Sequence, residues 1–297
     1  ELHRELCKPH LLRHPFFLLV AHIEAKVIVK LCDKAVSLTV HSQHDVVFTP
    51  GVKICESYLV ISGQLQYTQE EETSMVTHPV NRTILEGAWI CEAALWTTWV
   101  TVGTLEACSM CELLVVDADK VIEVFQRYFQ VSQLAGEYSQ AMCTRIRAAR
   151  LPAAEYPSDA CLPFASHAEI IASLRTQTRA FVAALAMKSL GPRGYLGTWS
   201  PWLTWDLSDG KRTAIITETG DVEFVSVLAS VRLLRRDGRV LCQLGIWDGQ
   251  LAQPACQLPT THLLENEVPW TAAQRLVREQ LAPLAQYTSL KHLYSEQ

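Results

Sequence analysis

Short runs of β-branched and aromatic residues, broken by turn residues, fill the chain from residue 36 to about residue 116. The clearest breaks are Pro50-Gly51 and Ser62-Gly63. The second break separates the apolar runs 57–61 and 64–67 by a two-residue connection of the kind that sets hairpin register. A succession of short strands with such breaks predicts an all-β roll or sandwich.

Apolar residues at helical spacing flank this β region on both sides. The spacing predicts a helix over Pro15–Asp33 before the roll and a long helical stretch over Asp117–Arg150 after it. Arg145 lies near the end of that stretch, where a positive charge suits the negative pole of the helix dipole. We therefore expect a first domain over residues 1–150, formed by a β-roll (jelly roll) with flanking helices.

A change of composition follows the first domain. Residues 151–166 contain three prolines with Ser, Asp and Ala between them, which favours a linker. Beyond it, the pattern predicts a helix over Ala168–Leu190, strands with hairpin turns at Thr219-Gly220 and Asp237-Gly238, and a final amphipathic helix over Pro269–Leu284. We expect a second, α/β domain over residues 167–297, so that the chain as a whole is α+β.

Composition and charge narrow the classes of function. The chain has 297 residues, 49% of them hydrophobic, which favours two globular domains over disorder. The net charge of −5 gives no electrostatic basis for a nucleic-acid partner. The apolar run Phe16–Ala21 is far shorter than the roughly 20 residues of a membrane span, so we expect no direct membrane insertion.

The cysteines indicate a cellular location, and the first residue indicates whether the chain is part of a longer polypeptide. Ten cysteines lie scattered through apolar surroundings, which favours reduced thiols and a cytoplasmic location. The pair Cys108 and Cys111 has the spacing of a metal knuckle but lacks a second pair of ligands, so we expect no metal there. Because the chain begins with Glu1, we expect it to be a piece of a longer polypeptide.

Residues 87–95 read Gly-Ala-Trp-Ile-Cys-Glu-Ala-Ala-Leu and follow a Pro-Gly turn and a Ser-Gly turn in order. This arrangement resembles the cyclic-nucleotide-binding domains of kinase regulatory subunits, bacterial transcription regulators and gated channels, over about residues 5–148. The resemblance implies a cassette in which helix N-terminal amides hold a cyclic phosphate and a glutamate accepts from the ribose. It also implies an arginine, nine residues after the glutamate, on the phosphate.

The resemblance implies a nucleotide site that is changed in this chain. The implied site residues are Cys91, Glu92, Ala93, Ala94, Thr101 and Val102. Thr101 stands where the family has its arginine, and Cys91 replaces the glycine before the glutamate. The loss of a charged phosphate partner predicts weak binding of cAMP or cGMP, or none, and no other cofactor is expected. Glu92 has a second interpretation, as a partner of the helix dipole, and both stay open.

The C-terminal helix shows a weaker resemblance, to the Nudix family. With Arg275 in register, the family's first glutamate falls on Glu267, but Leu276 replaces a signature glutamate. Of the Glu-Glu pair, Glu279 remains beside Gln280. If this site were active, Glu267 and Glu279 would hold Mg²⁺, although two carboxylates are too few and no catalysis is expected. The alternative is an ordinary amphipathic helix with a solvated Glu279.

These observations favour a non-catalytic regulatory region rather than an enzyme. The expected partners are other domains or subunits of a larger assembly. Because such rolls resemble the C-terminal parts of voltage-gated potassium or cyclic-nucleotide-gated channels, the resemblance implies a parent of this kind, with this region on its cytosolic side. The alternative function is a Mg²⁺-dependent, Nudix-type hydrolase of nucleoside diphosphate derivatives that the roll regulates. A kinase regulatory subunit is a third hypothesis, but no inhibitor segment is visible in the sequence.

Overall fold

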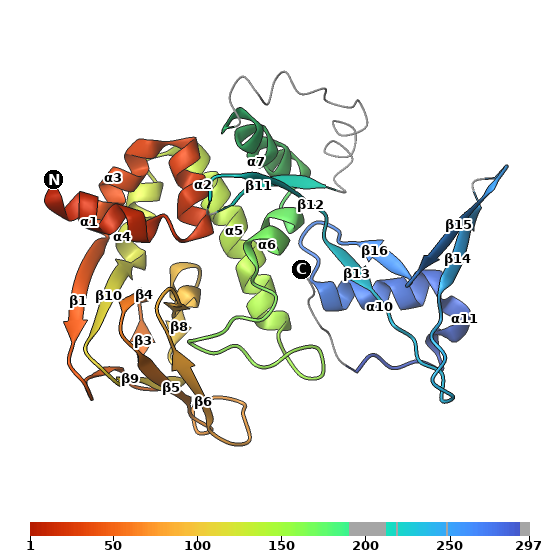
Figure 1. Ribbon diagram of the computed structural model, residues 1–297, viewed down its shortest axis with the longest axis horizontal. Coiled ribbons are helices and arrows are strands. Elements are labelled where there is room, and N and C mark those ends of the chain that lie inside the picture. Colours follow the sequence, from red (N-terminus) through yellow and green to blue (C-terminus); the bar gives the residue numbers. More distant parts are fainter. Residues whose placement is uncertain (190–211, 218, 248, 292–297) are drawn as a thin grey trace.

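The computed structural model describes residues 1–189, 212–217, 219–247 and 249–291. It combines helices with antiparallel sheets, and the N-terminal helices lie over one end of a β-roll (Figure 1). The helices of this half are α1 (Leu2–Leu11), α2 (Pro15–Ile23), α3 (Ala25–Lys34), α4 (Ala118–Phe125) and α5 (Phe129–Ala148).

Two four-stranded sheets, in the orders β1-β10-β4-β7 and β2-β9-β5-β6, form the roll together with the pair β3-β8. The strands are β1 (Val36–His41), β2 (Val46–Phe48), β3 (Lys53–Ile54), β4 (Glu56–Ser62), β5 (Leu65–Gln69), β6 (Val80–Ile84), β7 (Trp89–Ile90), β8 (Trp99–Val100), β9 (Gly103–Ala107) and β10 (Cys111–Asp117). A buried cluster between the sheets includes Val60, Tyr67 and Leu113. The predicted roll with flanking helices is therefore the fold of this half.

The turn at Gly63 differs from the predicted hairpin. Strands β4 and β5 lie in different sheets and do not pair with each other. Gly63 has a φ of +92°, and a Cβ at this position would lie 2.5 Å from the carbonyl oxygen of Met110. A glycine is needed here because the chain passes directly over β10 as it crosses from one sheet to the other.

Each long predicted helix is two helices in the structure. Glu24 separates α2 from α3 with an extended backbone (φ −154°, ψ 94°). The stretch expected over 117–150 breaks between α4 and α5, and the stretch expected from 168 is divided into α6 (His167–Ser173) and α7 (Thr176–Ser189). The predicted end of that last stretch, Leu190, lies outside the described residues. Helical periodicity detects the turns of a helix but not the short breaks that tertiary packing imposes.

The domain boundary also differs from the expected linker. One core cluster contains Phe16 of α2 and Tyr138 of α5, and it continues into Ile170 of α6, Val182 of α7 and Ile215 of β11 (Thr213–Ile216). Residues 151–166 do not run free between two bodies, because Ala153, Ser158 and Asp159 are buried. Side chains from both sides of the expected boundary therefore share one core.

Arg145 lies in the last turn of α5, as expected, and is fully buried where α5 meets α6. Its Nη2 donates to the carbonyl of Glu169 at 2.8 Å and to the hydroxyl of Ser173 at 3.0 Å, and its Nη1 donates to the carbonyl of Ala141 at 3.2 Å. Burial lowers the pKa of this guanidinium to about 10. Its hydrogen bonds offset part of the cost of burying the cation.

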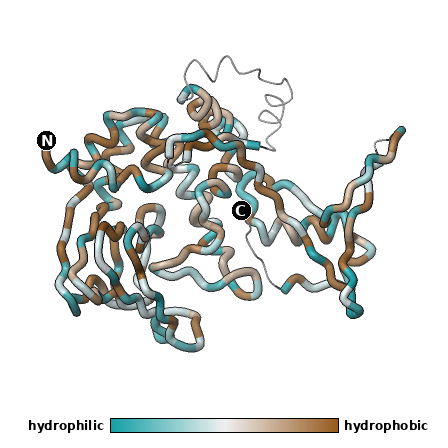
Figure 2. Tube along the Cα trace, in the orientation of Figure 1, coloured by the Kyte–Doolittle hydropathy of each residue, from teal (hydrophilic) through white to brown (hydrophobic). Residues whose placement is uncertain are grey.

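The described C-terminal part contains three separate two-stranded antiparallel sheets, β11-β12, β13-β16 and β14-β15, and not one α/β sheet. The strands are β12 (Val222–Val225), β13 (Leu228–Ser230), β14 (Gln243–Trp247), β15 (Ala252–Gln257) and β16 (Thr260–His262). Two helices, α10 (Pro269–Gln280) and α11 (Ala282–Ala285), follow them. The hairpin predicted at Thr219-Gly220 is confirmed. At Asp237-Gly238 the chain turns back on itself, but its flanks pair through the single bridge between Leu234 and Val240 and form no strands. Hydrophobic segments gather inside the roll and among its helices, whereas the β14-β15 ribbon extends away from them (Figure 2).

Candidate ligand pocket and the segment that fills it

The cassette predicted at residues 87–95 contains strand β7 and, after Cys91, a short 3-10 helix, η1 (Glu92–Leu95). Cys91 precedes it in the left-handed conformation, with φ 56° and ψ 30°. This is a conformation that favours glycine, the residue that the family resemblance implies at this position. Cys91 is buried, and its side chain is part of the hydrophobic core of the roll.

The backbone N–H of Cys91 points at the segment that was expected to be a linker. It donates to the carbonyl oxygen of Asp159 at 2.7 Å. Ser158 and Cys161 pair as an antiparallel bridge, with the N–H of Ser158 donating to the carbonyl of Cys161 at 2.9 Å, so Asp159 lies at the tip of a tight turn. The loop after α5 lies beside the roll in Figure 1. The segment Pro157–Pro163, here called the inserted segment, therefore docks on the cassette.

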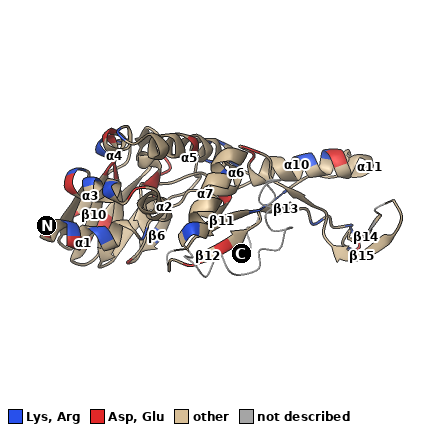
Figure 3. Cartoon of the chain, turned by 90° about the horizontal axis from the view of Figure 1, so that it is seen from above, with Lys and Arg blue, Asp and Glu red and all other residues tan. Residues whose placement is uncertain are grey.

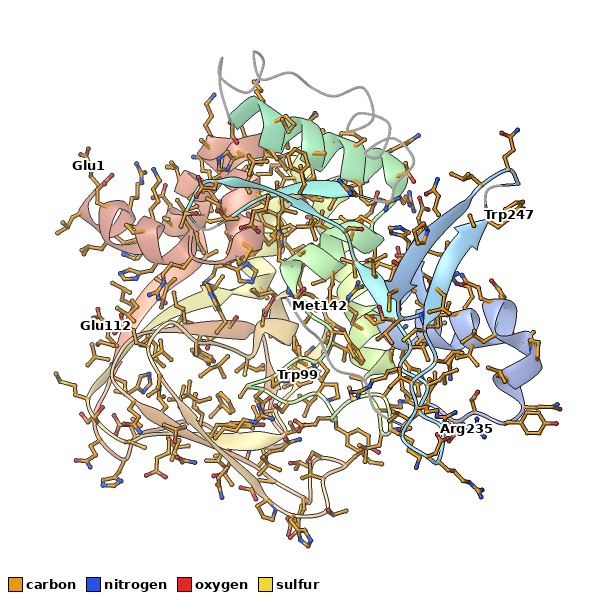
Figure 4. The ribbon with its side chains drawn as sticks, turned by 45° about the vertical axis from the view of Figure 1, so that its right-hand side comes forward. Glu1, Trp99, Glu112, Met142, Arg235 and Trp247 are labelled. Atoms are coloured by element: carbon orange, nitrogen blue, oxygen red, sulfur yellow. The ribbon has the colours of Figure 1, made fainter. Side chains whose placement is uncertain are left out.

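Three hydrogen-bond donors converge on the side-chain carboxylate of Asp159. Its Oδ1 accepts from the indole N–H of Trp99 at 2.6 Å. Its Oδ2 accepts from the hydroxyl of Tyr67 at 2.9 Å and from the backbone N–H of Val102 at 2.9 Å. The residue is 3% exposed. Figure 4 shows Trp99 between the strands of the roll and the loop after α5. Such a constellation holds an anion, and here the anion is a carboxylate of the same chain.

The electrostatics of the pocket follow from burial. Burial raises the pKa of the Asp159 carboxyl, and the hydrogen bonds from Trp99, Val102 and Tyr67 oppose this increase. Burial and the neighbouring Asp159 both raise the pKa of Tyr67 well above its ordinary value, so Tyr67 stays a phenol that can donate. The pocket thus balances a buried carboxylate with neutral donors instead of a cation.

Apolar contacts complete the docking of the inserted segment. Leu162 packs against a buried cluster of Ala93, Ala94 and Trp99. Ala160 packs against the core of the roll. Two of the predicted nucleotide-site residues, Ala93 and Ala94, are therefore in contact with the chain's own segment rather than open to a ligand.

Thr101, at the position of the family's arginine, has a structural use in this chain. It is fully buried, and its hydroxyl donates to the carbonyl of Thr49 at 2.6 Å and accepts from the N–H of Val52 at 3.1 Å. These hydrogen bonds close the Pro50-Gly51 turn between β2 and β3. The neighbouring Val102 is the residue of this pair that reaches the pocket, through its N–H to Asp159.

Glu92 is linked to the N-terminal helices. Its Oε1 accepts from Nε2 of His14, at 3.2 Å. The N–H of Phe16 donates to Nδ1 of the same ring at 3.2 Å, which leaves the ring proton on Nε2. His14 is 3% exposed and packs its ring edge-on against Trp89. The cassette is thus coupled to the start of α2, and the ribose-binding role of Glu92 stays a prediction.

The sequence predicted the residues of the cassette but not Asp159 and Tyr67, which contact each other beside it. Asp159 lies in a segment of Pro, Ser and Ala that is typical of linkers, and Tyr67 lies in an ordinary alternating strand. The one available signal was Trp99, a buried tryptophan whose N–H needs an acceptor. Trp96 and Trp99 are both buried, whereas Trp89 is half-buried.

The two carboxylates of the Nudix resemblance do not form a metal site. Arg275 donates to both oxygens of Glu267, from Nε at 2.9 Å and from Nη2 at 2.8 Å, and the N–H of Leu264 also donates to this carboxylate at 2.9 Å. Glu279 is exposed and pairs with the neighbouring Arg278. Among the described residues, no group of three His, Cys, Asp or Glu could hold a metal ion.

Comparisons with known proteins identify no family. No protein-family model and no curated protein match the chain. Among solved structures, it is similar to the C-linker/CNBHD of zELK channels crystallised in the presence of cAMP, with 16% identity and a TM-score of 0.34, covering 41% of this chain and 59% of that one.

Two further solved structures are similar at the same level. One is the N-terminal domain of a transcriptional regulator from Streptomyces coelicolor, with 17% identity and a TM-score of 0.34, covering 46% of this chain and 92% of that one. The other is the regulatory domain of Toxoplasma gondii PKA with cAMP, with 17% identity and a TM-score of 0.34, covering 44% of this chain and 48% of that one. The chain spans less than two thirds of the channel and kinase structures.

Proposed function

We propose that this region is a non-catalytic regulatory module of the cyclic-nucleotide-binding type, in which the chain's own inserted segment takes the place of the ligand. The observation that carries the proposal is the position of Asp159, whose backbone and side chain together accept four hydrogen bonds from the cassette and the adjoining strands. In a pocket built for a cyclic phosphate, the helix N-terminus and nearby amides would hold the phosphate oxygens. Here the carboxylate of Asp159, which is an anion like the cyclic phosphate, supplies the accepting oxygens.

Weak or absent binding of cAMP and cGMP follows from two features. Thr101 offers no cation and is committed to the Pro50-Gly51 turn. A nucleotide would also have to displace the docked segment before it reached the N–H of Cys91. Its apparent affinity is then the intrinsic affinity multiplied by the fraction of molecules in which the pocket is open. Isothermal titration of residues 1–297 with cAMP and cGMP is expected to give no saturable heat, and a micromolar dissociation constant would contradict the proposal.

The docking itself has a sharper test, which is amide hydrogen exchange. Asp159→Ala removes the carboxylate and leaves the donors of Tyr67, Trp99 and Val102 without their acceptor. Because each hydrogen bond to a charged group contributes about 1.5–3 kcal/mol, the inserted segment should undock. Exchange at the amide of Cys91, which donates to the backbone of residue 159 and not to its side chain, should then accelerate by roughly a hundredfold or more.

Glu155→Ala is the matched control for this experiment. Glu155 lies in the same stretch of chain, but its carboxylate is 76% exposed and pairs with Arg82 at the surface. The control should leave exchange at Cys91 unchanged, since exposed ion pairs contribute little. Equal exchange rates at Cys91 in the wild type and in Asp159→Ala would show that the segment does not dock through this carboxylate.

We also propose that the module acts within a larger assembly, such as a voltage-gated potassium or cyclic-nucleotide-gated channel, on its cytosolic side. The support is the resemblance of the cassette together with the link between Glu92 and His14, through which a change in the pocket would reach the N-terminal helices. Sequencing the transcript upstream of Glu1 tests this context, because a channel would carry apolar spans of roughly 20 residues there. A hydrolase is not proposed, since Glu267 is already paired with Arg275.

A further inference from the structure

A hairpin in the C-terminal part concentrates positive charge in an otherwise acidic chain. The charged residues within 224–247 are four arginines and one aspartate, so the net charge of this stretch is +3. The whole chain has a net charge of −5, so the remaining residues sum to −8 (−5 − 3). The site thus differs in sign from the rest of the molecule, and it lies outside the pocket of the proposed function.

The geometry of the hairpin keeps these charges together. The N–H of Arg235 donates to the carbonyl of Arg239 at 2.9 Å, and the N–H of Leu241 donates to the carbonyl of Leu233 at 3.0 Å. Gly238 turns the chain with a φ of +84°. Leu234 and Val240 also form an isolated bridge, so the two arms of this turn, residues 232–241, are held side by side; we call them the arginine hairpin.

The single carboxylate of the arginine hairpin is shared. One oxygen of Asp237 lies 3.5 Å from Nε of Arg235 and 3.5 Å from Nε of Arg239, and both arginine side chains remain at least 74% exposed. Arg232 and Arg236 are exposed as well. Three positive charges thus remain uncompensated within the hairpin, and solvent reaches all four guanidinium groups.

One exposed leucine lies among the arginines and two follow the last of them. Leu234 is 62% exposed, Leu241 is 38% exposed, and Leu244 at the start of β14 is 78% exposed. Figure 4 shows Arg235 and Trp247 at opposite ends of the C-terminal part, and Leu244 belongs to the strand β14 that leads to Trp247. Exposed leucines next to exposed arginines give this part of the chain the mixed apolar and basic surface that interfacial membrane contacts use.

We propose that the arginine hairpin binds the surface of a bilayer that contains anionic phospholipids. The guanidinium groups would donate to lipid phosphates, while Leu234 and Leu244 would enter the boundary between headgroups and acyl chains. An acidic protein segment would satisfy the arginines but not the leucines, which favours the lipid. The contact is peripheral, because among the described residues no helix is long and apolar enough to cross a bilayer.

The experiment is co-sedimentation of the full chain with vesicles of phosphatidylcholine alone, and with vesicles of equal parts phosphatidylcholine and phosphatidylserine. Binding is expected to the second kind and to weaken with added salt. The double variant Arg232→Glu/Arg236→Glu removes two cations, each of which contributes about 1 kcal/mol near an anionic surface, so the affinity should fall by roughly thirtyfold or more.

The double variant Lys26→Glu/Lys30→Glu is the matched control, because it makes the same change of charge on the exposed face of α3, a helix that carries charges of both signs (Figure 3). It should bind phosphatidylserine vesicles as the wild type does. Leu234→Ser/Leu244→Ser should also weaken binding while leaving all arginines in place. Circular dichroism of each variant checks that it is folded.

Three results would overturn the proposal. The first is an absence of binding to phosphatidylserine vesicles by the folded wild type. The second is an equal loss of binding in the arginine variant and in the α3 control, since net charge alone would then explain the attraction. The third is binding to polyglutamate without binding to the vesicles, which would assign the hairpin to an acidic protein partner.

Discussion

Replacement of Tyr67 by Phe removes one hydroxyl from the filled pocket and keeps the ring. The hydroxyl is fully buried and donates to Oδ2 of Asp159 at 2.9 Å. Because a hydrogen bond to a charged group contributes about 1.5–3 kcal/mol, Tyr67→Phe should lower the free energy of unfolding by that amount. Oδ2 keeps the N–H of Val102, so the loss should stay below that of removing the carboxylate itself.

A double-mutant cycle separates this hydrogen bond from the other contributions of Tyr67. In the Asp159→Ala background the acceptor is gone, and Tyr67→Phe should then cost less than about 0.5 kcal/mol. The assay is urea unfolding followed by tryptophan fluorescence, with equal slopes required so that the free energies can be compared. If Tyr67→Phe costs the same in both backgrounds, the hydroxyl and the carboxylate do not interact, and the pocket described above is wrong.

Three further predictions concern other parts of the chain. Burial, with a contribution from His14, lowers the pKa of His167 to about 3 from 6.5, so the unfolded chain binds more protons between these values. Stability should therefore fall as the pH drops from about 6.5 toward 3, and His167→Gln should flatten that part of a denaturation–pH curve. Arg275→Lys replaces the two-pronged contact with Glu267 by a single donor, and should lower stability by about 1–3 kcal/mol in urea unfolding, whereas Arg278→Lys, at an exposed pair, should have almost no effect. Gly63→Ala adds a Cβ that would lie 2.5 Å from a backbone oxygen at a φ of +92°, so it should cost about 2 kcal/mol or more, while Gly136→Ala, on an open face of α5, should be neutral or stabilising; thermal unfolding of the two variants compares them.

Local sequence patterns predicted the elements of the first half well. Short β-branched and aromatic runs between turn residues predicted the strands of the roll, and the Pro50-Gly51 turn lies where it was expected, with Gly51 at a φ of +80°. The position of the cassette was also predicted, since η1 begins at Glu92. These features depend on residues close together in sequence, which is why one sequence was enough to find them.

Pairing and long-range contacts were not predictable in the same way. Strands β4 and β5 are joined by a short turn that resembles a hairpin, yet the turn passes between the two sheets because Gly63 can approach Met110 so closely. Arg145 lies in the last turn of α5, as expected, but its burial against α6 was not predicted. Both outcomes depend on neighbours that lie far away in the chain.

The sequence by itself predicted a β-roll with flanking helices, because short strand-forming runs and turn residues can be read from the residues alone. The cassette with Thr101 in place of an arginine is what the family resemblance implies. The tertiary structure decided what fills that cassette. Asp159 lies 92 residues from Tyr67, 60 from Trp99 and 57 from Val102, so their convergence leaves no local pattern. A segment of Pro, Ser and Asp that is typical of a linker becomes part of the pocket because buried donors require an acceptor.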